Sequence, residues 1–271
     1  MHQHGIAGDW GSAPARKTEA SEGARPLPPA GRFGVTRRLI DAWLKDRRQF
    51  RRGALPRSCP ICGYVGRFIS VGHPPRWDAR CPGCGSRERH RLMQLWIIEG
   101  GGNRLSGKRI LHFAPERIWQ TMMRGNPLYE TADLAQKGVT HQADITAVPL
   151  PDASYDVVIA HHVLEHIPDD RKAMRELFRL LQPGGFAILT VPINPTRQHT
   201  YENPAITTPE ARFAHFSAHD HIRYYGLDFT DRLTVAGFRA ETFRMRPDQE
   251  VEFGLGRQEM MFIAHRALPG A

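Results

Sequence analysis

Four cysteines form the clearest chemical pattern in this chain of 271 residues. Cys59-x-x-Cys62 and Cys81-x-x-Cys84 are separated by 18 residues, and a glycine follows each pair. Two thiolates at this spacing on a tight knuckle can bind one ion, and two knuckles complete a tetrahedron of sulfur ligands. Because four protein thiolates leave no position for water, we expect the Zn²⁺ to be structural.

Two disulfides or free thiols are the alternative for these cysteines. The first twenty residues contain no apolar stretch of the kind found in secretory signals, so we expect a cytoplasmic protein, in which disulfides are rare. A bound zinc ion would also explain how so short a module folds, since the free energy of ligation substitutes for a missing apolar core.

The net charge of +9 is distributed unevenly. Residues 1–91 contain 18 Lys and Arg against 7 Asp and Glu, a net charge of +11, whereas residues 92–271 have a net charge of −2. The basic part, 35–91, is therefore where RNA or another polyanion would bind. An apolar content of 41% excludes a wholly disordered chain. No apolar run reaches the length of a transmembrane segment.

Changes in composition divide the chain into five parts. The expected parts are a disordered tail rich in Gly, Pro and Ala (1–34), a basic amphipathic helix (35–57), the zinc ribbon (58–91), a helix with a Gly-rich linker (92–107) and a larger domain (108–271). The basic side of the helix could contact phosphate or a membrane surface, but a solvated helix packed on the ribbon is the simpler interpretation.

The larger domain alternates predicted strands and helices, which indicates α/β architecture. Continuous apolar strands separated by helices are typical of a parallel sheet covered on both faces. The predicted strands are 109–114, 155–160 and 186–192, the predicted helices are 118–124, 170–181 and 229–236, and a tight turn is expected at 183–185. Segments 238–245 and 259–264 are expected to close the sheet as a strand pair.

Four segments of this domain are specific in their combined order and spacing. They read DITAVPLPDASYD (144–156), VVIA (157–160), HVLEH (162–166) and LQPGG (181–185). Over roughly 108–266, the chain resembles class I S-adenosylmethionine-dependent methyltransferases, in particular the type 11 group. The resemblance implies a Rossmann-like seven-stranded mixed sheet, with S-adenosyl-L-methionine bound beyond the C-terminal ends of the parallel strands.

The resemblance also assigns residues to the methionine end of the cofactor. In the family, the first strand ends in a Gly-rich turn, but here it reads Leu111-His-Phe-Ala-Pro-Glu116. His112 replaces the usual acidic residue, and Ala114, Pro115 and Glu116 replace the glycines. Proline lacks the N–H donor. His112, Ala114 and Glu116 are the expected contacts at this end.

Further assignments concern the nucleoside end of the cofactor. Asp133, after the second strand, would accept both ribose hydroxyls, with Glu130 as the competing candidate. Asp144 would accept from the adenine amino group, and Ile145 would pack on the ring. Helix capping or turn formation is the alternative role for the two aspartates.

Histidines supply the candidate catalytic groups. His161 and His162 follow the central strand near the expected methyl group, where one could act as a general base or serve only in packing. The long segment 192–226 is expected to cover the cofactor as a lid. In it, His221 oriented by Asp220 would be a base, and Arg223 would hold an anionic substrate group, unless these residues only fasten the lid.

These features predict methyl transfer to an oxygen or nitrogen of a small-molecule, saccharide or peptide-linked acceptor. One alternative is an RNA methyltransferase that holds RNA with the basic zinc-ribbon region. The absence of an Asn-Pro-Pro-Tyr-like motif after the central strand and the near-neutral larger domain argue against it. The other alternative, motivated by the altered turn at 114–116, is a non-catalytic zinc-ribbon binding protein on a degenerate methyltransferase scaffold.

Overall fold

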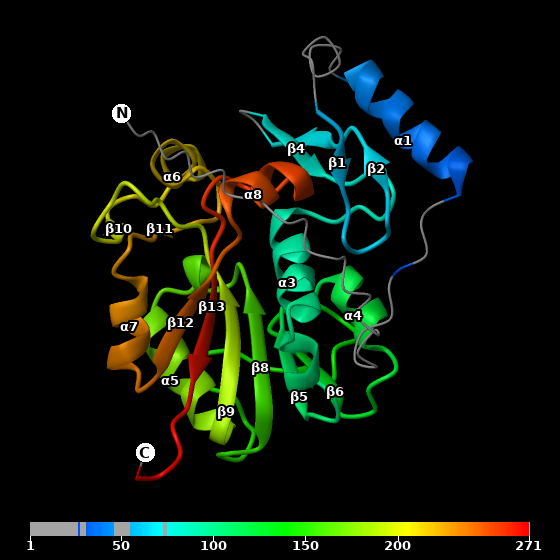
Figure 1. Ribbon diagram of the computed structural model, residues 1–271. Helices are drawn as coiled ribbons and strands as arrows, with labels where there is room; N and C mark the ends of the chain where they lie inside the picture. Colours follow the sequence, from blue (N-terminus) through cyan, green and yellow to red (C-terminus); the bar gives the residue numbers. More distant parts are fainter. Residues whose placement is uncertain (1–26, 28–30, 46–54, 73–74, 271) are drawn as a thin grey trace, which may run out of the picture.

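The computed structural model describes residues 27, 31–45, 55–72 and 75–270 (Figure 1). Most of the tail predicted to be disordered, and residues 46–54 of the predicted basic region, lie outside the described residues. The helices are α1 Arg32–Lys45, α3 Glu88–Ile98, α4 Arg117–Met123, α5 Asp170–Leu180, α6 Pro209–Phe216, α7 Phe229–Val235 and α8 Pro247–Phe253, with 3₁₀ turns η1 Gly101–Arg104 and η2 Leu164–His166. In the described part of the chain, no helix is long and apolar enough to cross a membrane.

A seven-stranded mixed sheet forms the centre of the larger domain, which confirms the predicted fold class. Its order is β12-β13-β9-β8-β5-β6-β7, and only β13 runs antiparallel to its two neighbours. Its strands are β5 Ile110–Phe113, β6 Tyr129–Asp133, β7 His141–Gln142, β8 Tyr155–His161, β9 Leu181–Thr190, β12 Arg239–Phe243 and β13 Met261–His265. The short strands are β1 Arg57–Ser58, β2 Val65–Gly66, β3 Ile69–Val71, β4 Arg76–Arg80, β10 Tyr201–Glu202 and β11 Arg223–Tyr224.

Helices cover both faces of this sheet, as the continuous apolar strands predict. Along β8, Val158 and Ala160 pack into the cluster that contains the apolar stripe of α5, whereas Val157 and Ile159 pack with α3 and α4. Figure 1 shows α5 and α7 on one side of the sheet and α3 and α4 on the other. A parallel sheet buried on both faces needs the near-continuous hydrophobic strands seen in the sequence.

The predicted tight turn at 183–185 is wrong, because these residues belong to β9. The backbone N–H of Gly184 donates to the carbonyl oxygen of Arg266, and that of Arg266 donates to Gly185. Gly184 has φ +82°, and a Cβ at Gly185 would lie 2.7 Å from the carbonyl oxygen of Asp156. The two glycines therefore permit a close backbone approach inside the sheet rather than a chain reversal.

The cysteine pairs lie on two small hairpins, β1–β2 and β3–β4, and α1 packs against them. Arg38 of α1 donates to the carbonyl oxygens of Pro82 (2.8 Å) and Gly83 (2.9 Å). Figure 1 places this module at the end of the sheet toward which the parallel strands run, beside α8 and near the insert that contains α6, β10 and β11. Ligands of open α/β sheets bind at that end.

The close approach at Gly185 gives a stability prediction. We expect Gly185→Ala to lower the free energy of unfolding by about 2 kcal/mol, because a backbone carbonyl stands in the way of the new methyl group. Gly125→Ala is the matched control, since no atom lies within 4 Å of its added Cβ. Urea denaturation followed by circular dichroism measures both variants, and equal midpoints would contradict the assignment.

Candidate metal centre and active site

The four cysteine sulfurs are arranged as ligands of one ion. The Sγ atoms of Cys59 and Cys84 lie 3.7 Å apart, as do those of Cys62 and Cys81, and all four lie within 4.8 Å of one another. The cysteines are free rather than disulfide-bonded. A tetrahedron with Zn–S bonds of about 2.3 Å has sulfur–sulfur edges of roughly 3.8 Å, so the spacing fits Zn²⁺ with four thiolates.

Glycines shape both knuckles of this cluster. Gly63 (φ +71°) and Gly85 (φ +82°) donate to the carbonyl oxygens of Cys59 and Cys81, both at 2.9 Å. A Cβ at Gly83 would lie 2.9 Å from the Sγ atom of Cys62. The chain therefore turns tightly enough to aim both sulfurs of a pair at one point.

Arg91 connects the metal centre to the C-terminal part of the chain. Its fully buried guanidinium donates to the carbonyl oxygens of Ser86 (2.8 Å), Ala79 (3.0 Å) and Phe253 (2.7 Å), and also to that of Gly254. It also lies 4.8 Å from the ring centroid of Phe68. Arg91 thus holds the ribbon against α8, together with Arg57 of β1, which donates to the carbonyl oxygen of Val251.

Arg89 and His90, also in α3, hold the turn that follows β5. Arg89 donates two hydrogen bonds to Oε1 of Glu116, and Nε2 of His90 lies 2.8 Å from Oε2. Nδ1 of His90 accepts from the N–H of Arg87, so the ring proton is on Nε2 and faces the carboxylate. Although burial opposes ionisation, His90 and Arg89 lower the pKa of Glu116. Glu116, expected to contact the cofactor, instead ties α3 to α4.

The side chains of His112 and His161 also contact other residues of the protein. Nδ1 of His112 lies 2.8 Å from the hydroxyl of Tyr129, and Nδ1 of His161 lies 3.0 Å from Oγ1 of Thr190. Burial lowers the pKa of His112 to about 4 and that of His161 well below its usual value, so both rings are neutral. Their observed contacts are packing between the sheet and the helices α3 and α4.

Ala114, Asp133 and Asp144 lie beyond the carboxyl ends of the parallel strands. Ala114 has φ +47°, a left-handed conformation that glycine adopts more readily than any residue with a Cβ. Oδ1 of Asp133 accepts from two backbone N–H groups at 2.7 Å, and Oδ1 of Asp144 accepts from the N–H and hydroxyl of Thr146. These hydrogen bonds from Thr146 lower the pKa of Asp144. The bonds leave Oδ2 of each aspartate for another donor.

The competing candidate, Glu130, is committed elsewhere. Its carboxylate accepts from Arg109 and Tyr155 and contacts His141 at 2.5 Å. Asp133 is therefore the better placed carboxylate at the end of β6. Ile145, expected to pack on the adenine ring, is 5% exposed and belongs to the apolar core.

Three imidazoles surround one buried carboxylate after β8. Oε1 of the fully buried Glu165 lies 3.1 Å from Nδ1 of His162, 3.9 Å from Nε2 of His221 and 4.0 Å from Nε2 of His166. Oε2 of Glu165 has no hydrogen-bond partner among the described residues. Burial lowers the pKa of His221, which favours its neutral form. Glu165, His166 and His221 could also ligate a divalent ion, since their ligand atoms lie within 4.8 Å of one another.

Two of the predicted catalytic assignments do not match the geometry. Oδ2 of Asp220 lies 3.5 Å from His166, so the expected orienting contact with His221 is replaced by one with its neighbour. Arg223 is 3% exposed and donates to the carbonyl oxygens of Leu164 and Pro168 and to Glu202. Its guanidinium is fully used in fastening the insert, which corrects the expectation that it holds a substrate anion.

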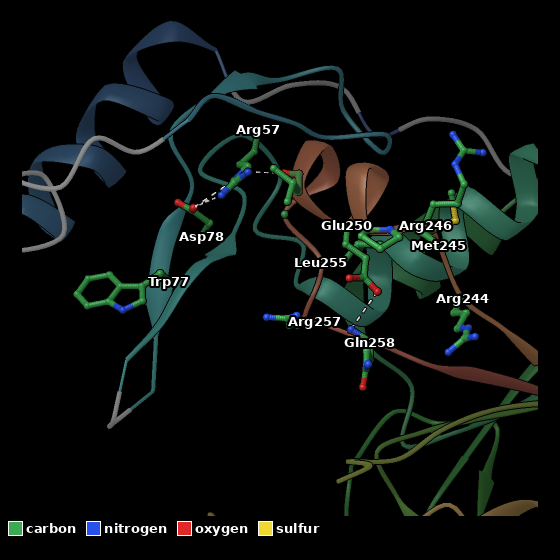
Figure 2. A pocket seen from close by; sticks show the side chains of 13 residues that line it. Arg57, Trp77, Asp78, Arg244, Met245, Arg246, Glu250, Leu255, Arg257 and Gln258 are labelled. Atoms are coloured by element: carbon green, nitrogen blue, oxygen red, sulfur yellow. Dashed lines mark hydrogen bonds and ion pairs between the residues drawn. The ribbon is translucent and has the colours of Figure 1, made fainter. Parts of the chain in front are cut away.

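Two neighbouring cavities open at this end of the molecule. The smaller has a volume of about 240 Å³ and is lined by His162 together with Arg89, Tyr224 and Arg257. The larger, about 710 Å³, lies between the ribbon and the C-terminal segment (Figure 2). Its lining residues Trp77, Arg244 and Arg257 were not identified from the sequence. In the sequence, only their amino-acid types, one aromatic and two basic residues, could have pointed to them. Segments 77–78 and 244–258 are far apart in the chain and meet only in the fold.

The metal centre gives a stoichiometry prediction. We expect one zinc ion per chain by mass spectrometry of the metal content, and none in the Cys81→Ser/Cys84→Ser double variant, because two thiolates are lost. His166→Ala is the control for the second set of possible ligands and should retain one zinc ion. Zinc retained by the double cysteine variant, or lost from His166→Ala, would contradict this site assignment.

Comparisons with known proteins agree with this geometry. A family described as a methyltransferase domain matches residues 115–189. A probable S-adenosylmethionine-dependent methyltransferase of Mycolicibacterium smegmatis is 34% identical over 190 residues, which cover 69% of this chain and 68% of the relative. The 27-O-demethylrifamycin SV methyltransferase of Amycolatopsis mediterranei is 42% identical over 62 residues, 23% of each chain.

A solved S-adenosylmethionine-dependent methyltransferase of Mesorhizobium loti aligns with 58% of this chain and 90% of its own length, at 18% identity and a TM-score of 0.41. Three findings agree on the family: the identity with the mycobacterial relative over 190 residues, the matched methyltransferase domain and the seven-stranded sheet. The chain belongs to the class I S-adenosylmethionine-dependent methyltransferases.

Proposed function

We propose that this methyltransferase methylates an oxygen or nitrogen atom whose proton is taken by His162. The observation that carries the proposal is the position of this histidine. It follows β8 directly, has φ +53°, and lines the smaller cavity. Non-glycine residues in the left-handed region cost about 1–2 kcal/mol and gather at functional sites.

Glu165 orients the proposed base. Its Oε1 lies 3.1 Å from Nδ1 of His162, so Nδ1 carries the ring proton and Nε2 is left as the proton acceptor. S-adenosylmethionine, when bound, would supply an electrophilic methyl group, whose bond to sulfur breaks in the transfer with S-adenosylhomocysteine as the leaving group. As the acceptor atom forms its new bond to carbon, His162 takes the proton that this atom loses, and the protonated imidazole is stabilised by the buried carboxylate of Glu165.

Ala114, Asp133 and Asp144 are the residues we propose for holding the cofactor. Ala114 follows β5, Asp133 is the last residue of β6, and Asp144 lies after β7; these are the three strands at one end of the parallel order. Each aspartate has one oxygen left for a hydroxyl or amino donor, and the backbone at Ala114 turns sharply at the strand end. Glu116, His112 and His161 support this arrangement from within the fold.

The positive net charge of the N-terminal residues overstates how much charge is free to bind RNA. Several arginines counted in residues 35–91 bind groups of the protein itself: Arg38, Arg57, Arg89 and Arg91. The cavity lined by His162 is about 240 Å³, which suits the reacting part of a small acceptor. We therefore favour a small-molecule or saccharide acceptor.

Substitution of His162 tests the proposed base. We expect His162→Gln to lower transfer of the tritiated methyl group into fractionated cell extract by about 10²–10⁴-fold, because the acceptor proton has no base to accept it. Nuclease treatment of the extract should leave labelling by the wild type unchanged. Binding of S-adenosylhomocysteine, measured by calorimetry, should stay within threefold of the wild type.

The matched control is His199→Gln, which changes an exposed histidine of the segment 192–226 and should label the extract like the wild type. Undiminished labelling by His162→Gln would rule out its role as the base. Loss of labelling after nuclease treatment would identify RNA as the acceptor and contradict the small-acceptor proposal.

A further inference from the structure

The larger cavity combines two parts of the chain that are far apart in sequence. Arg57, Trp77 and Asp78 come from the zinc ribbon, and the rest of its lining comes from residues 244–258. Figure 2 shows Trp77 and Arg257 on opposite sides of this space, with the Arg257 side chain directed toward the side of Trp77. A volume of about 710 Å³ is ordinary for a small-molecule site.

Positive charge exceeds negative charge in the lining. Four arginines face two carboxylates, and both carboxylates are already engaged. Asp78 pairs with Arg57 at 2.9 Å, and Glu250 accepts from the backbone N–H of Gln258 at 2.9 Å. Arg244 and Arg257 make no ion pair with any residue that the structure describes. The cavity therefore offers two guanidinium groups that have no ion-pair partner among the described residues, and guanidinium groups are suited to phosphate oxygens.

The lining of the larger cavity also contains an exposed aromatic ring and two residues with a strained backbone. Trp77 is 43% exposed, unusually open for so large an apolar ring. Asp78 (φ 55°) and Gln258 (φ 60°) both have left-handed backbones although neither is glycine. Such conformations are unfavourable for residues that carry a Cβ, and they cluster at binding and catalytic sites. The two strained residues stand on opposite walls, one in the ribbon and one before β13.

The larger cavity adjoins the smaller one, in which the proposed reaction site lies. Arg257 and Gln258 line both the larger cavity and the smaller one that contains His162. A ligand anchored in the larger cavity can thus extend a further group past these two residues toward the proposed base. The ribbon then forms one wall of the acceptor site.

We propose that the larger cavity binds the nucleoside diphosphate portion of a nucleotide-linked acceptor. Arg244 and Arg257 hold the phosphates, and the base packs on Trp77. The group linked to the phosphates, a saccharide for example, lies in the smaller cavity with its hydroxyl or amino group at His162. This assignment rests on the proposed function and adds to it the class of substrate.

Binding of uridine and guanosine diphosphates tests the assignment directly. Calorimetry is done with the full-length zinc-loaded protein saturated with S-adenosylhomocysteine, so that the cofactor site is closed to the probes. We expect at least one of the two diphosphates to bind, and to bind at least tenfold more weakly to Arg244→Gln/Arg257→Gln. Trp77→Leu should weaken binding of the nucleotide but not of inorganic pyrophosphate.

Arg239→Gln is the matched control, because this arginine lies on β12 with its side chain 80% exposed, outside the cavity lining. It should bind the diphosphates like the wild type. Failure of both diphosphates to bind, or equal binding by the double arginine variant, would overturn the assignment. Tighter binding of a twelve-nucleotide RNA than of either diphosphate, lost in the double variant, would overturn it in favour of RNA.

His162→Gln should bind the diphosphates like the wild type, since His162 lines only the smaller cavity. Failure of this assignment and failure of the proposed base are therefore distinguishable. If this assignment is wrong, the wild type does not bind the diphosphates. If the proposed base is wrong, His162→Gln still transfers the labelled methyl group.

Discussion

The buried guanidinium of Arg91 is the interaction on which the arrangement of this molecule depends. A charge with no exposed surface is costly unless every donor is satisfied, and here its donors reach carbonyl oxygens of both the ribbon and the α8 region. Burial lowers the pKa of Arg91, while Glu88 and the cysteine thiolates oppose that effect. A Zn²⁺ ion held by four thiolates would carry a net charge of −2, so an ion at this cluster and the guanidinium of Arg91 would stabilise each other.

Contacts from α3 attach the four-cysteine module both to the turn after β5 and to α8. Helix α3 begins immediately after the second knuckle, and consecutive residues in its first turn point to different partners. Arg89 and His90 hold Glu116 beside the turn after β5, and Arg91 holds α8. Both contacts fix backbone next to proposed ligand sites, at Ala114 and at Gln258. A structural metal can in this way affect catalysis without touching the substrate.

The sequence was sufficient for the parts of the fold that depend on local patterns. The strand at 155–161, the amphipathic helix at 170–180 and the closing strand pair follow from apolar periodicity, and the zinc ligands follow from spacing. The Pro-Gly-Gly segment at 183–185 misled the turn prediction, because a close contact with Asp156 requires the same residue type as a chain reversal.

Long-range contacts explain why several site residues have other partners in the structure than the sequence predicted. Nothing local shows that Glu116 faces Arg89, that Arg223 is enclosed by the segment after β8, or that Trp77 and Arg257 share a cavity. A polar residue in a motif can serve the ligand or the fold, and only its partners distinguish the two roles. His162 was identified from its position after the central strand, whereas its contact with Glu165 is evident only in the fold.

Hydrogen–deuterium exchange before and after removal of zinc by a chelator tests the coupling of the ribbon to the active end most directly. If Arg91 and Glu116 transmit the order of the ribbon, exchange should increase in three regions: the ribbon itself, the turn at 114–117 and residues 247–258. It should stay unchanged in β8 and β9. An increase confined to residues 57–86 would show that the ribbon is an independent attachment, and would contradict this account.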